Sequence, residues 1–563
     1  MKGPQVKGGQ TIEPRTEDPK TVPVGMTDTP PYAAYILRHL PRVLSQVNRD
    51  RDMTTYGSCD RNYWHQSIRD FSSAILQQTC LTLALAYKED FPGNYCYGNE
   101  NVREWSVAAL RYMGTIQLKD GSFNEYYPNE HSFPATAFNL YAACKTYRLL
   151  KLEDAHILGS LRKAADWLCC HDETATCNQQ LASIAGLYQY YRITEEQTVL
   201  DGVDRKMTGI LSLYSGEGWF PEQGGADIGY SSVALDMLTD YFEESGDERV
   251  RRIIEEMVEF LSHFIHPDGT AGGEYGSRNT VYFLPAGLET CVRLDLNAGT
   301  ASAMIRKLYE EDGRGSFMDS VDDRYLTHYV LHSYLRALAG CKPRRCREGR
   351  LPYQIPHRTV FKKAGLMTIC DGDCYAVVGL AKGGILKVYR NGKEICNDCG
   401  YRIPLAPGRI AATNWLNPEL EVLIRENQAL IRGRFTVVKS RTQTPLYHFL
   451  LRLAALVRGE RLRDDIKRLT IFQKEKSEAS FGRRIVFEQE KIRIEDKICN
   501  PTGKALVRAS NISFRLVASA KFFASSDLLW QGPENYGTAG KVTLCRTIDL
   551  RGGKTQEERI EYA

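Results

Sequence analysis

Two stretches decide how this chain is interpreted: 177–191, CNQQLASIAGLYQYY, and 218–242, GWFPEQGGADIGYSSVALDMLTDYF. In each, polar residues at a turn run directly into a segment whose apolar residues recur every three or four positions. That spacing predicts a helix, and the preceding polar residues predict its first turn. Asn178 and Tyr230 stand at the two helix starts. The stretches therefore predict two helices that begin beside polar side chains.

The same helical spacing continues from about residue 31 to residue 340. Three longer loops carry related text, KDGSFNEYYPNEHSF, GEGWFPEQGGADIGY and HPDGTAGGEYGSRNT, which indicates a weak internal repeat of helical pairs. Such pairs favour an α/α toroid of about six helical hairpins over residues 31–345, with the loops on one rim. The spacing predicts helices at 32–48, 66–88, 102–116, 133–150, 154–171, 178–191, 196–212, 229–245, 247–265, 279–293, 298–310 and 323–339.

The text changes at a basic, proline-bearing linker over about 341–356. Beyond it, short runs rich in Val, Ile, Phe and Thr alternate with polar residues and end at Gly, Asn or Asp, as β-strands do. We expect an antiparallel β-sandwich over 346–563, with one helix near 446–458. Residues 1–30, rich in Pro, Thr, Gly and charge, are predicted to be a mobile tail. The expected strands are TVFKKA, LMTICDG, CYAVVGL, ILKVYR, EVLIRE, ALIRGRFTVV, RRIVFEQEKIRIEDKI, NISFRLV and KVTLCRTIDL.

Charge is unevenly divided along a chain whose overall net charge is only +4. Residues 351–563 carry a net charge of +14 and residues 1–350 a net charge of −10. A basic second half favours an anionic polymer as partner, although opposite charges also help two domains dock. No dense Lys/Arg run with interleaved aromatic residues occurs, so a nucleic acid is not expected.

Neither a secretory signal nor a membrane span is expected, because no apolar stretch has the required length. The 16 cysteines are scattered rather than arranged as a disulfide framework. A cytoplasmic chain with mostly free thiols is the prediction, and a processed secreted form stays open. No cofactor is expected. The single CxxC at Cys396 and Cys399 is weak evidence for a structural metal.

A helical toroid followed by a sandwich, with these helix starts, resembles the heparinase II/III-like polysaccharide lyases and their alginate lyase relatives. The resemblance covers most of residues 60–500 and is carried by Asn178, Tyr230 and the strand text at 483–498. The family often has His after the Asn, where this chain has Gln179. It also often has a His near the first sandwich strands, but residues 374–402 contain none.

The resemblance implies β-elimination on a glycan that contains uronic acid. Removal of the weakly acidic C5 proton requires neutralisation of the adjacent carboxylate, because negative charge develops there. An amide such as that of Asn178, or an Arg, can neutralise it, and Tyr230 can act as base and acid. His131, in a loop before a helix, can share the proton transfer. The alternative roles are a helix cap or turn for Asn178, a packed core aromatic for Tyr230, and a surface or capping histidine for His131.

Further rim residues are candidates for substrate binding by stacking, hydrogen bonding or ion pairing. Arg278 is suited to a bidentate contact with a carboxylate, and glycines around it allow close backbone approach. The aromatic rings are suited to stacking on sugars. A hydrogen-bonded turn or structural corner is the alternative for each. The candidates are Arg61, Trp64, His65, Gln179, Trp219, Glu222, Glu274, Tyr275, Arg278 and Asn279.

Other functions remain open on the same fold. A glycoside hydrolase would use two loop carboxylates as acid and base. A C5-epimerase would share the first proton abstraction with a lyase, and a non-catalytic protein would bind glycan or assist its synthesis. The polymer, its linkage, endo or exo action and the oligomeric state are left open by the sequence. The hydrolase candidates are Glu125, Glu130, Glu222, Asp227 and Glu274.

Overall fold

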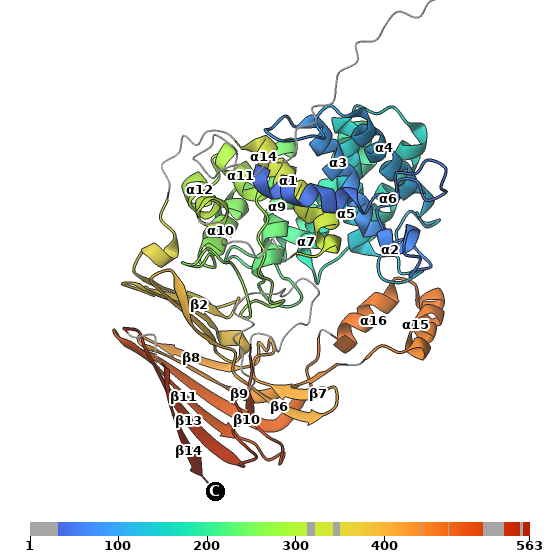
Figure 1. Ribbon diagram of the computed structural model, residues 1–563. Helices are drawn as coiled ribbons and strands as arrows, with labels where there is room; N and C mark the ends of the chain where they lie inside the picture. The colour runs from blue at the N-terminus through green and yellow to red at the C-terminus, as the bar shows by residue number, and fades with distance from the viewer. Residues whose placement is uncertain are drawn as a thin grey trace, which may run out of the picture.

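A computed structural model describes residues 32–311, 321–341, 349–440, 442–470, 472–510, 534–551 and 555–562. Most of its helices precede its antiparallel sheets along the chain, and the two parts lie against each other (Figure 1). This helical and antiparallel composition is the one that the sequence predicts. The predicted tail at 1–30 and the predicted strand NISFRLV at 511–517 lie outside the described residues.

The helices of the first part agree with most predicted ranges to within a few residues. The helix predicted at 66–88 begins later, with a 3-10 turn, η1 (Ala74–Gln78), and the one predicted at 279–293 begins only at Ala286. The bounds are α1 (Ala33–Leu44), α2 (Arg61–Trp64), α3 (Thr79–Lys88), α4 (Glu100–Thr115), α5 (Phe133–Leu149), α6 (Ala155–Cys170), α7 (Cys177–Thr194), α8 (Gln197–Leu211), α9 (Ile228–Ser245), α10 (Arg251–Ser262), α11 (Ala286–Arg293), α12 (Ala298–Ile305), α13 (Asp323–Tyr325) and α14 (Leu331–Gly340). Two π-helical turns, η2 (Arg306–Glu310) and η4 (Leu326–Val330), continue α12 and precede α14.

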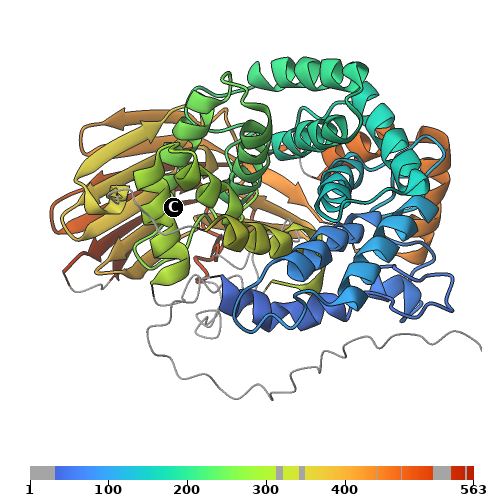
Figure 2. The ribbon, with the colours of Figure 1, turned by 90° about the horizontal axis from the view of Figure 1, so that it is seen from above.

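Six of these helices pack on one another in a closed cycle, which runs α3, α5, α7, α9, α11, α14 and back to α3. The helices α4, α8, α10, α12 and α1 each pack against one member of the cycle from the outside, and α6 packs against two, α5 and α7 (Figure 2). Inner helices are buried on nearly all sides, as α7 is from Cys177 to Leu187, except at Gln179. Outer helices such as α10 bury a single apolar stripe. Glycines allow the closest approaches, because a Cβ at Gly186 would lie 3.0 Å from the backbone nitrogen of Tyr141 on α5.

Two antiparallel sheets follow. The first is a five-stranded meander of β1 (His357–Phe361), β2 (Leu366–Asp371), β3 (Cys374–Gly379), β4 (Ile385–Arg390) and β5 (Lys393–Asp398). The second has the order β12-β6-β7-β9-β10-β11-β13-β14, with β8 also paired to β9. Its bounds are β6 (Tyr401–Ala406), β7 (Arg409–Ala412), β8 (Glu421–Arg425), β9 (Gln428–Lys439), β10 (Lys476–Phe487), β11 (Lys491–Cys499), β12 (Val507–Arg508), β13 (Lys541–Asp549) and β14 (Thr555–Tyr562).

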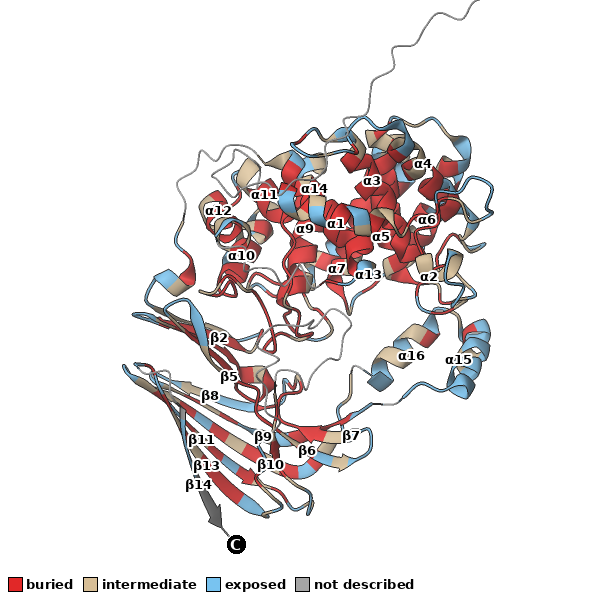
Figure 3. Cartoon of the chain, in the orientation of Figure 1, coloured by how far each residue is buried: buried red, intermediate tan, exposed pale blue. Residues whose placement is uncertain are grey.

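The central strands of the first sheet, β2, β3 and β4, are buried on both faces (Figure 3). Tyr375 and Val377 of β3 belong to the apolar cluster of the helices, whereas Ala376 and Val378 belong to the cluster shared with the second sheet. Side chains alternate between the faces of a strand, so an uninterrupted apolar run such as CYAVVGL can serve both clusters. The structure is therefore layered as helices, first sheet and second sheet.

A buried ion cluster ties four strands of the second sheet together. The guanidinium of Arg483 (β10) bonds both carboxylate oxygens of Asp496 (β11), at 2.7 and 3.0 Å. Arg546 (β13) and the hydroxyl of Tyr401 (β6) bond the same carboxylate, at 2.6 and 2.7 Å. Burial of these charges is tolerated because each is paired. None of these four residues lines either of the two cavities between the helices and the second sheet, so we assign the cluster a structural role.

A helical hairpin, α15 (Pro445–Arg458) and α16 (Arg461–Thr470), interrupts the second sheet between β9 and β10. The sequence predicts α15 but not α16. The hairpin reaches back to the helical part, where Tyr127 packs against Ala455 and Leu462 (Figure 1). Glu173, just before α7, accepts hydrogen bonds from Arg463 at 2.6 Å and Lys467 at 2.7 Å. The hairpin thus bridges the two parts of the chain beside the start of α7.

Candidate functional site

Glu222 connects the first of the two predicted helix starts to the loop before the second. Its two carboxyl oxygens accept hydrogen bonds from the backbone nitrogen of Asn178 at 2.8 Å and from the Asn178 side-chain nitrogen at 2.7 Å. Burial raises the pKa of Glu222 well above its ordinary value, against the lowering effect of those two hydrogen bonds. Ser277 donates to the Glu222 backbone carbonyl at 2.7 Å. Three segments far apart in sequence therefore meet at Glu222.

Asp227 fixes the second helix start. One of its oxygens caps α9 by accepting from the backbone nitrogen of Tyr230 at 3.2 Å, and the other accepts from the backbone nitrogen of Arg278 at 2.9 Å. The hydroxyl of Thr280 donates to the same buried carboxylate. Because a single carboxylate holds both backbones, the start of α9 and the Arg278 loop are kept in a fixed relation.

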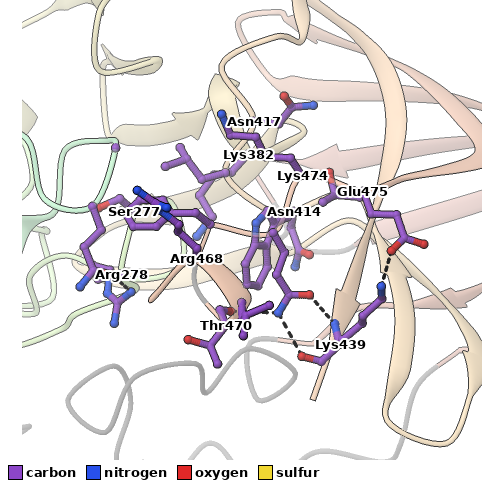
Figure 4. A pocket seen from close by; sticks show the side chains of 18 of the residues that line it. Ser277, Arg278, Lys382, Asn414, Asn417, Lys439, Arg468, Thr470, Lys474 and Glu475 are labelled. Carbon is purple, nitrogen blue, oxygen red and sulfur yellow. Dashed lines mark hydrogen bonds and ion pairs between the residues drawn. The ribbon is translucent and has the colours of Figure 1, made fainter. Parts of the chain in front are cut away.

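Arg278 opens onto the larger of two cavities in this region, a volume of about 920 Å³ (Figure 4). Its guanidinium donates to the side-chain oxygen of Gln223, while its Nε is buried without a hydrogen-bond partner. Asn279, in the left-handed region at φ 59°, accepts from Lys382. Burial lowers the pKa of Lys382 to about 8. Arg278, Asn279 and Gln223 are therefore polar groups of the helical rim that face an open space.

Cations dominate the lining of this cavity. It holds Arg278 and Lys382 on one side and a further set of cations from the second sheet and α16 on the other, against two carboxylates, Glu419 and Glu475. Glu475 is itself paired with Arg409 and Lys439. An anionic ligand is favoured there, since clefts lined by one sign of charge concentrate the opposite charge. The further cations are Lys439, Arg468, Lys474 and Lys476.

His131 lies at a second cavity of about 680 Å³, which shares Arg468, Phe472 and Lys474 with the first. Its Nδ1 is 2.6 Å from an oxygen of Asp120 and 2.8 Å from the hydroxyl of Ser122. The shared residues make the two cavities neighbours along α16. His131 belongs to the second, whereas the rim around Arg278 belongs to the first.

Tyr230 stands among other tyrosines. Its ring meets that of Tyr282 edge to face at 6.0 Å, and the hydroxyl of Tyr329 donates to that of Tyr282 at 3.0 Å. Burial raises the pKa of both Tyr282 and Tyr329 well above its ordinary value. The neighbouring His328 lies on the π-helical turn η4, and both of its ring nitrogens are buried without a hydrogen-bond partner. π-Helical turns occur frequently at functional sites.

Two further buried carboxyls, Glu125 and Glu130, lie in the loop between α4 and α5. Glu125 accepts from Arg324 at 2.7 Å, and the guanidinium of Arg324 lies 4.8 Å from the ring centroid of Tyr126. Glu130 accepts from the backbone nitrogens of Glu125 and Tyr126, at 2.8 and 2.6 Å. Burial, followed by the charge of Glu125, raises the pKa of Glu130 to about 7. The two carboxyls thus occupy different electrostatic environments.

Three predicted binding residues are buried within the fold. Trp219 is 6% exposed, and its indole nitrogen donates to Glu217 at 3.3 Å. The hydroxyl of Tyr275 lies 2.9 Å from His266 inside the helical core. Glu274 accepts from the buried Lys387 of β4 at 3.2 Å, which joins the helices to the first sheet. The structure thus buries all three side chains, and sequence spacing does not show which rim residues other layers cover.

The predicted aromatic corner before the first inner helix lies on and beside α2. Trp64 is half-buried and donates to the backbone carbonyl of Gln46 at 2.8 Å, while His65 is exposed and lies edge to face against it. Arg61 is half-buried. None of these three residues lines either of the two cavities. Gln179, in contrast, follows Asn178 on α7 and has a buried side-chain oxygen without a hydrogen-bond partner.

The cysteines of the CxxC lie in and after β5. Burial raises the pKa of Cys396 to about 12 and that of Cys399 well above its ordinary value, which disfavours the thiolate that a metal would require. Within the described ranges, no group of three or more His, Cys, Asp or Glu is placed to hold a metal ion. No described helix is both long and apolar enough to cross a bilayer.

Comparison with known proteins identifies the fold. No protein-family model matches the chain, and no curated protein matches it in sequence. Among solved structures, chondroitin AC lyase from Streptomyces coelicolor A3, in complex with chondroitin sulphate, is similar with a TM-score of 0.55 and 12% identity, over 86% of this chain and 69% of that one. A Paenibacillus xanthan lyase is similar with a TM-score of 0.53 and 11% identity, over 93% of this chain and about half (51%) of its own length. The chain therefore shares a fold with distant polysaccharide lyases, as the sequence resemblance implied.

Sequence reasoning missed several residues of this region, notably Arg324, His328 and Lys382. Arg324 and His328 stand in DDRYLTHYV, where an Arg, a His and two tyrosines crowd one helix start, and that density was an available signal. Lys382 stands in a glycine-rich strand connection, AKGG, that carries no comparable signal. Its position beside Asn279 depends on how the first sheet docks on the helices.

Proposed function

We propose that this protein is a polysaccharide lyase that cleaves an anionic glycan containing uronic acid by β-elimination. The observation that carries the proposal is the cation-lined cavity of about 920 Å³ that opens at Arg278, Asn279 and Gln223, beside the start of α9. The shared fold with chondroitin AC and xanthan lyases supports a glycan-acting enzyme. Under this proposal the closed cycle of helices is an α/α toroid, and the two sheets form its partner sandwich.

The first task of the site is to neutralise the uronate carboxylate, so that negative charge can develop on it. Arg278 faces the cavity and can bind a carboxylate through two parallel hydrogen bonds. Asn178 adds amide hydrogen-bonding capacity at the start of α7. Burial raises the pKa of Glu222, which favours the neutral form of this carboxyl over the charged form that would repel the substrate's carboxylate.

Tyr230 is the proposed base and acid. Its phenolate oxygen takes the C5 proton, the C4–O4 bond breaks as the C4–C5 double bond forms, and the phenol then protonates the departing oxygen. Asp227 holds the backbones of Tyr230 and Arg278 together, so the distance between base and neutraliser is set before substrate binds. Gln179 and Asn279 are proposed to bind the sugar, and His131 an adjoining sugar in the second cavity.

The test is the ultraviolet absorbance of the conjugated 4,5-double bond, which only elimination creates. The protein is incubated with heparan-type, chondroitin-type, hyaluronan, alginate and xanthan chains. Rising absorbance that is lost in Arg278→Ala supports the proposal. No absorbance with any polymer, while a C5 proton exchanges with solvent, would identify a C5-epimerase instead. Binding without either reaction would identify a glycan-binding protein.

A second candidate function is glycoside hydrolysis, and the pair Glu125 and Glu130 favours it. A buried carboxyl with a pKa of about 7 beside a second carboxyl is the arrangement used for a general acid and its partner. New reducing ends without ultraviolet absorbance, abolished in Glu130→Gln, would establish hydrolysis. The domain limits at 31–345 and 346–563 and the cytoplasmic location stay predictions under either function.

A further inference from the structure

The outer face of α15 carries a continuous apolar stripe. Of the sixteen large apolar side chains that are exposed among the described residues, seven lie on this one helix, so they form a patch rather than a scatter. Figure 3 shows α15 as an exposed helix at the periphery. The stripe consists of Leu446 (66% exposed), Phe449 (59%), Leu450 (53%), Leu453 (46%), Leu456 (68%) and Val457 (86%).

The stripe is separate from the face that holds α15 in the fold. On the inner face, Ala455 is buried and, with Leu451 and Ala454, packs against Tyr127 and Leu462. A helix that is apolar on two faces requires cover on both, and the described residues cover only one of them. The outer stripe is therefore an unpartnered helix face.

The spacing of the stripe is self-complementary. Leu446, Leu450, Leu453 and Val457 follow one another at intervals of four, three and four, which reads the same in both directions. Two antiparallel copies of α15 therefore bring Leu450 against Leu453 of the partner subunit and Leu446 against Val457 of the partner subunit. Such a contact uses one patch on both copies, as a two-fold symmetric interface does.

We propose that the outer face of α15 is the interface of a homodimer, in which α15 packs antiparallel to α15 of a second copy. The exposed fractions leave on the order of 600 Å² of apolar side chain on each copy. With the whole stripe covered, two copies together bury at most about 1,200 Å², which is the lower limit for a stable interface.

Charge beside the stripe favours a second copy over an acidic membrane surface. Arg452 pairs with Asp70 at 2.5 Å, and Arg458 pairs with Asp465 at 2.6 Å. Each of these cations beside the stripe is therefore neutralised within the chain. A helix that lies on an acidic membrane would instead present unpaired cations on its polar face. The paired charges suit the polar rim of a protein interface.

The dimer would also brace one wall of the cleft. Tyr447 of α15 and Arg468 of α16 line the larger cavity, and α16 lines the second as well. A hairpin held by the partner subunit at α15 and by Glu173 at α16 is restrained from both sides. The inference concerns assembly and stands whether or not the proposed β-elimination is confirmed.

Sedimentation velocity of the full chain from about 0.5 to 50 µM tests the proposal. The expected result is a species of twice the 63.7 kDa chain mass, and a single-chain species at the same concentrations for Leu450→Glu/Leu453→Glu. The matched control is Leu423→Glu, at a 45% exposed leucine on β8, which is expected to stay dimeric. Circular dichroism and Tm establish that each variant is folded.

A cysteine pair provides a second test if the glutamate variant fails to fold. Leu450→Cys/Leu453→Cys is expected to form a disulfide-linked dimer on mild oxidation, with residues 450 and 453 of different chains identified as linked by mass spectrometry. A wild-type chain that stays single throughout the concentration range overturns the proposal. So does co-sedimentation of a single-chain species with phosphatidylserine-containing vesicles that is lost in the glutamate variant, because it would assign the stripe to a membrane.

Discussion

The rim of the helical part and the α15–α16 hairpin face the same cleft but use polar groups differently. On the rim, Asn178, Glu222 and Asp227 are buried and bonded to one another or to neighbouring backbone. On the hairpin, Arg452 and Arg458 are about half exposed and are paired with the exposed Asp70 and the partly buried Asp465. Buried, mutually bonded groups hold a fixed geometry, whereas exposed ion pairs contribute little stability. The rim is therefore suited to holding reacting groups in fixed positions, and the hairpin is suited to attracting an anionic ligand and to contacting a partner.

The largest effect is expected from loss of the Tyr230 hydroxyl on the rim. Tyr230→Phe should lower kcat/KM on the cleaved polymer by at least about 100-fold, because the proton transfer loses its base. The variant is expected to keep the wild-type Tm. The measurement is the initial rate of double-bond formation. Tyr188→Phe, at the far end of α7, is the control, and full activity in Tyr230→Phe would remove this residue from the mechanism.

A matched pair of aspartates compares the two regions directly. Asp227→Ala should lower the free energy of unfolding by about 2–3 kcal/mol, because several hydrogen-bond donors lose a buried acceptor. Asp465→Ala, which removes the partner of Arg458, should cost less than about 1 kcal/mol. Chemical denaturation measures both. Equal losses in the two variants would contradict the distinction between rim and hairpin.

The docking of the hairpin is expected to depend on Glu173. Burial raises the pKa of this carboxyl, but the charges of Lys467 and Arg463 outweigh that effect, and the pKa is lowered overall. The stabilisation that the charged Glu173 gives to hairpin docking is therefore complete above the ordinary Glu pKa of about 4.3. It is lost as the pH falls below that value and Glu173 takes up a proton.

Hydrogen exchange of residues 445–470 at pH 7 measures this contribution. Glu173→Gln should speed exchange about 5- to 30-fold, which corresponds to about 1–2 kcal/mol. Glu248→Gln, which removes an exposed ion pair with Arg251, is the control. Unchanged exchange in Glu173→Gln would show that apolar contacts alone dock the hairpin.

The smallest effect concerns the cavity cation Lys382. Because burial lowers its pKa to about 8, Lys382 loses its charge between pH 7 and pH 9, while the arginines keep theirs. KM for the anionic glycan should therefore rise about 3- to 5-fold over that range. In Lys382→Met, KM at pH 7 should already be as high as that of the wild type at pH 9, and its pH dependence should be flat. A pH-independent wild-type KM would show that this lysine does not contact the glycan.

Local sequence determined most of the helices and several strands of this protein. Apolar spacing and caps lie within one or two turns, so the helix predicted at 178–191 is observed as α7 (Cys177–Thr194) and that at 446–458 as α15. The text RRIVFEQEKIRIEDKI is the paired end of β10 and β11. The polar segment of α16 was missed because it carries few apolar residues to reveal its period.

Only the tertiary structure decided which polar groups meet. Asn178 and Glu222 are 44 residues apart, and Asp227 reaches Arg278 over 51, so no local pattern could pair them. The sequence also could not show that the first sheet would cover Glu274, or that Trp219 would be buried. Helix and strand formation follow from neighbours along the chain, whereas burial and long-range pairing follow from how the layers pack. The sequence by itself thus determined the elements, and the packing of helices, sheets and hairpin decided the site.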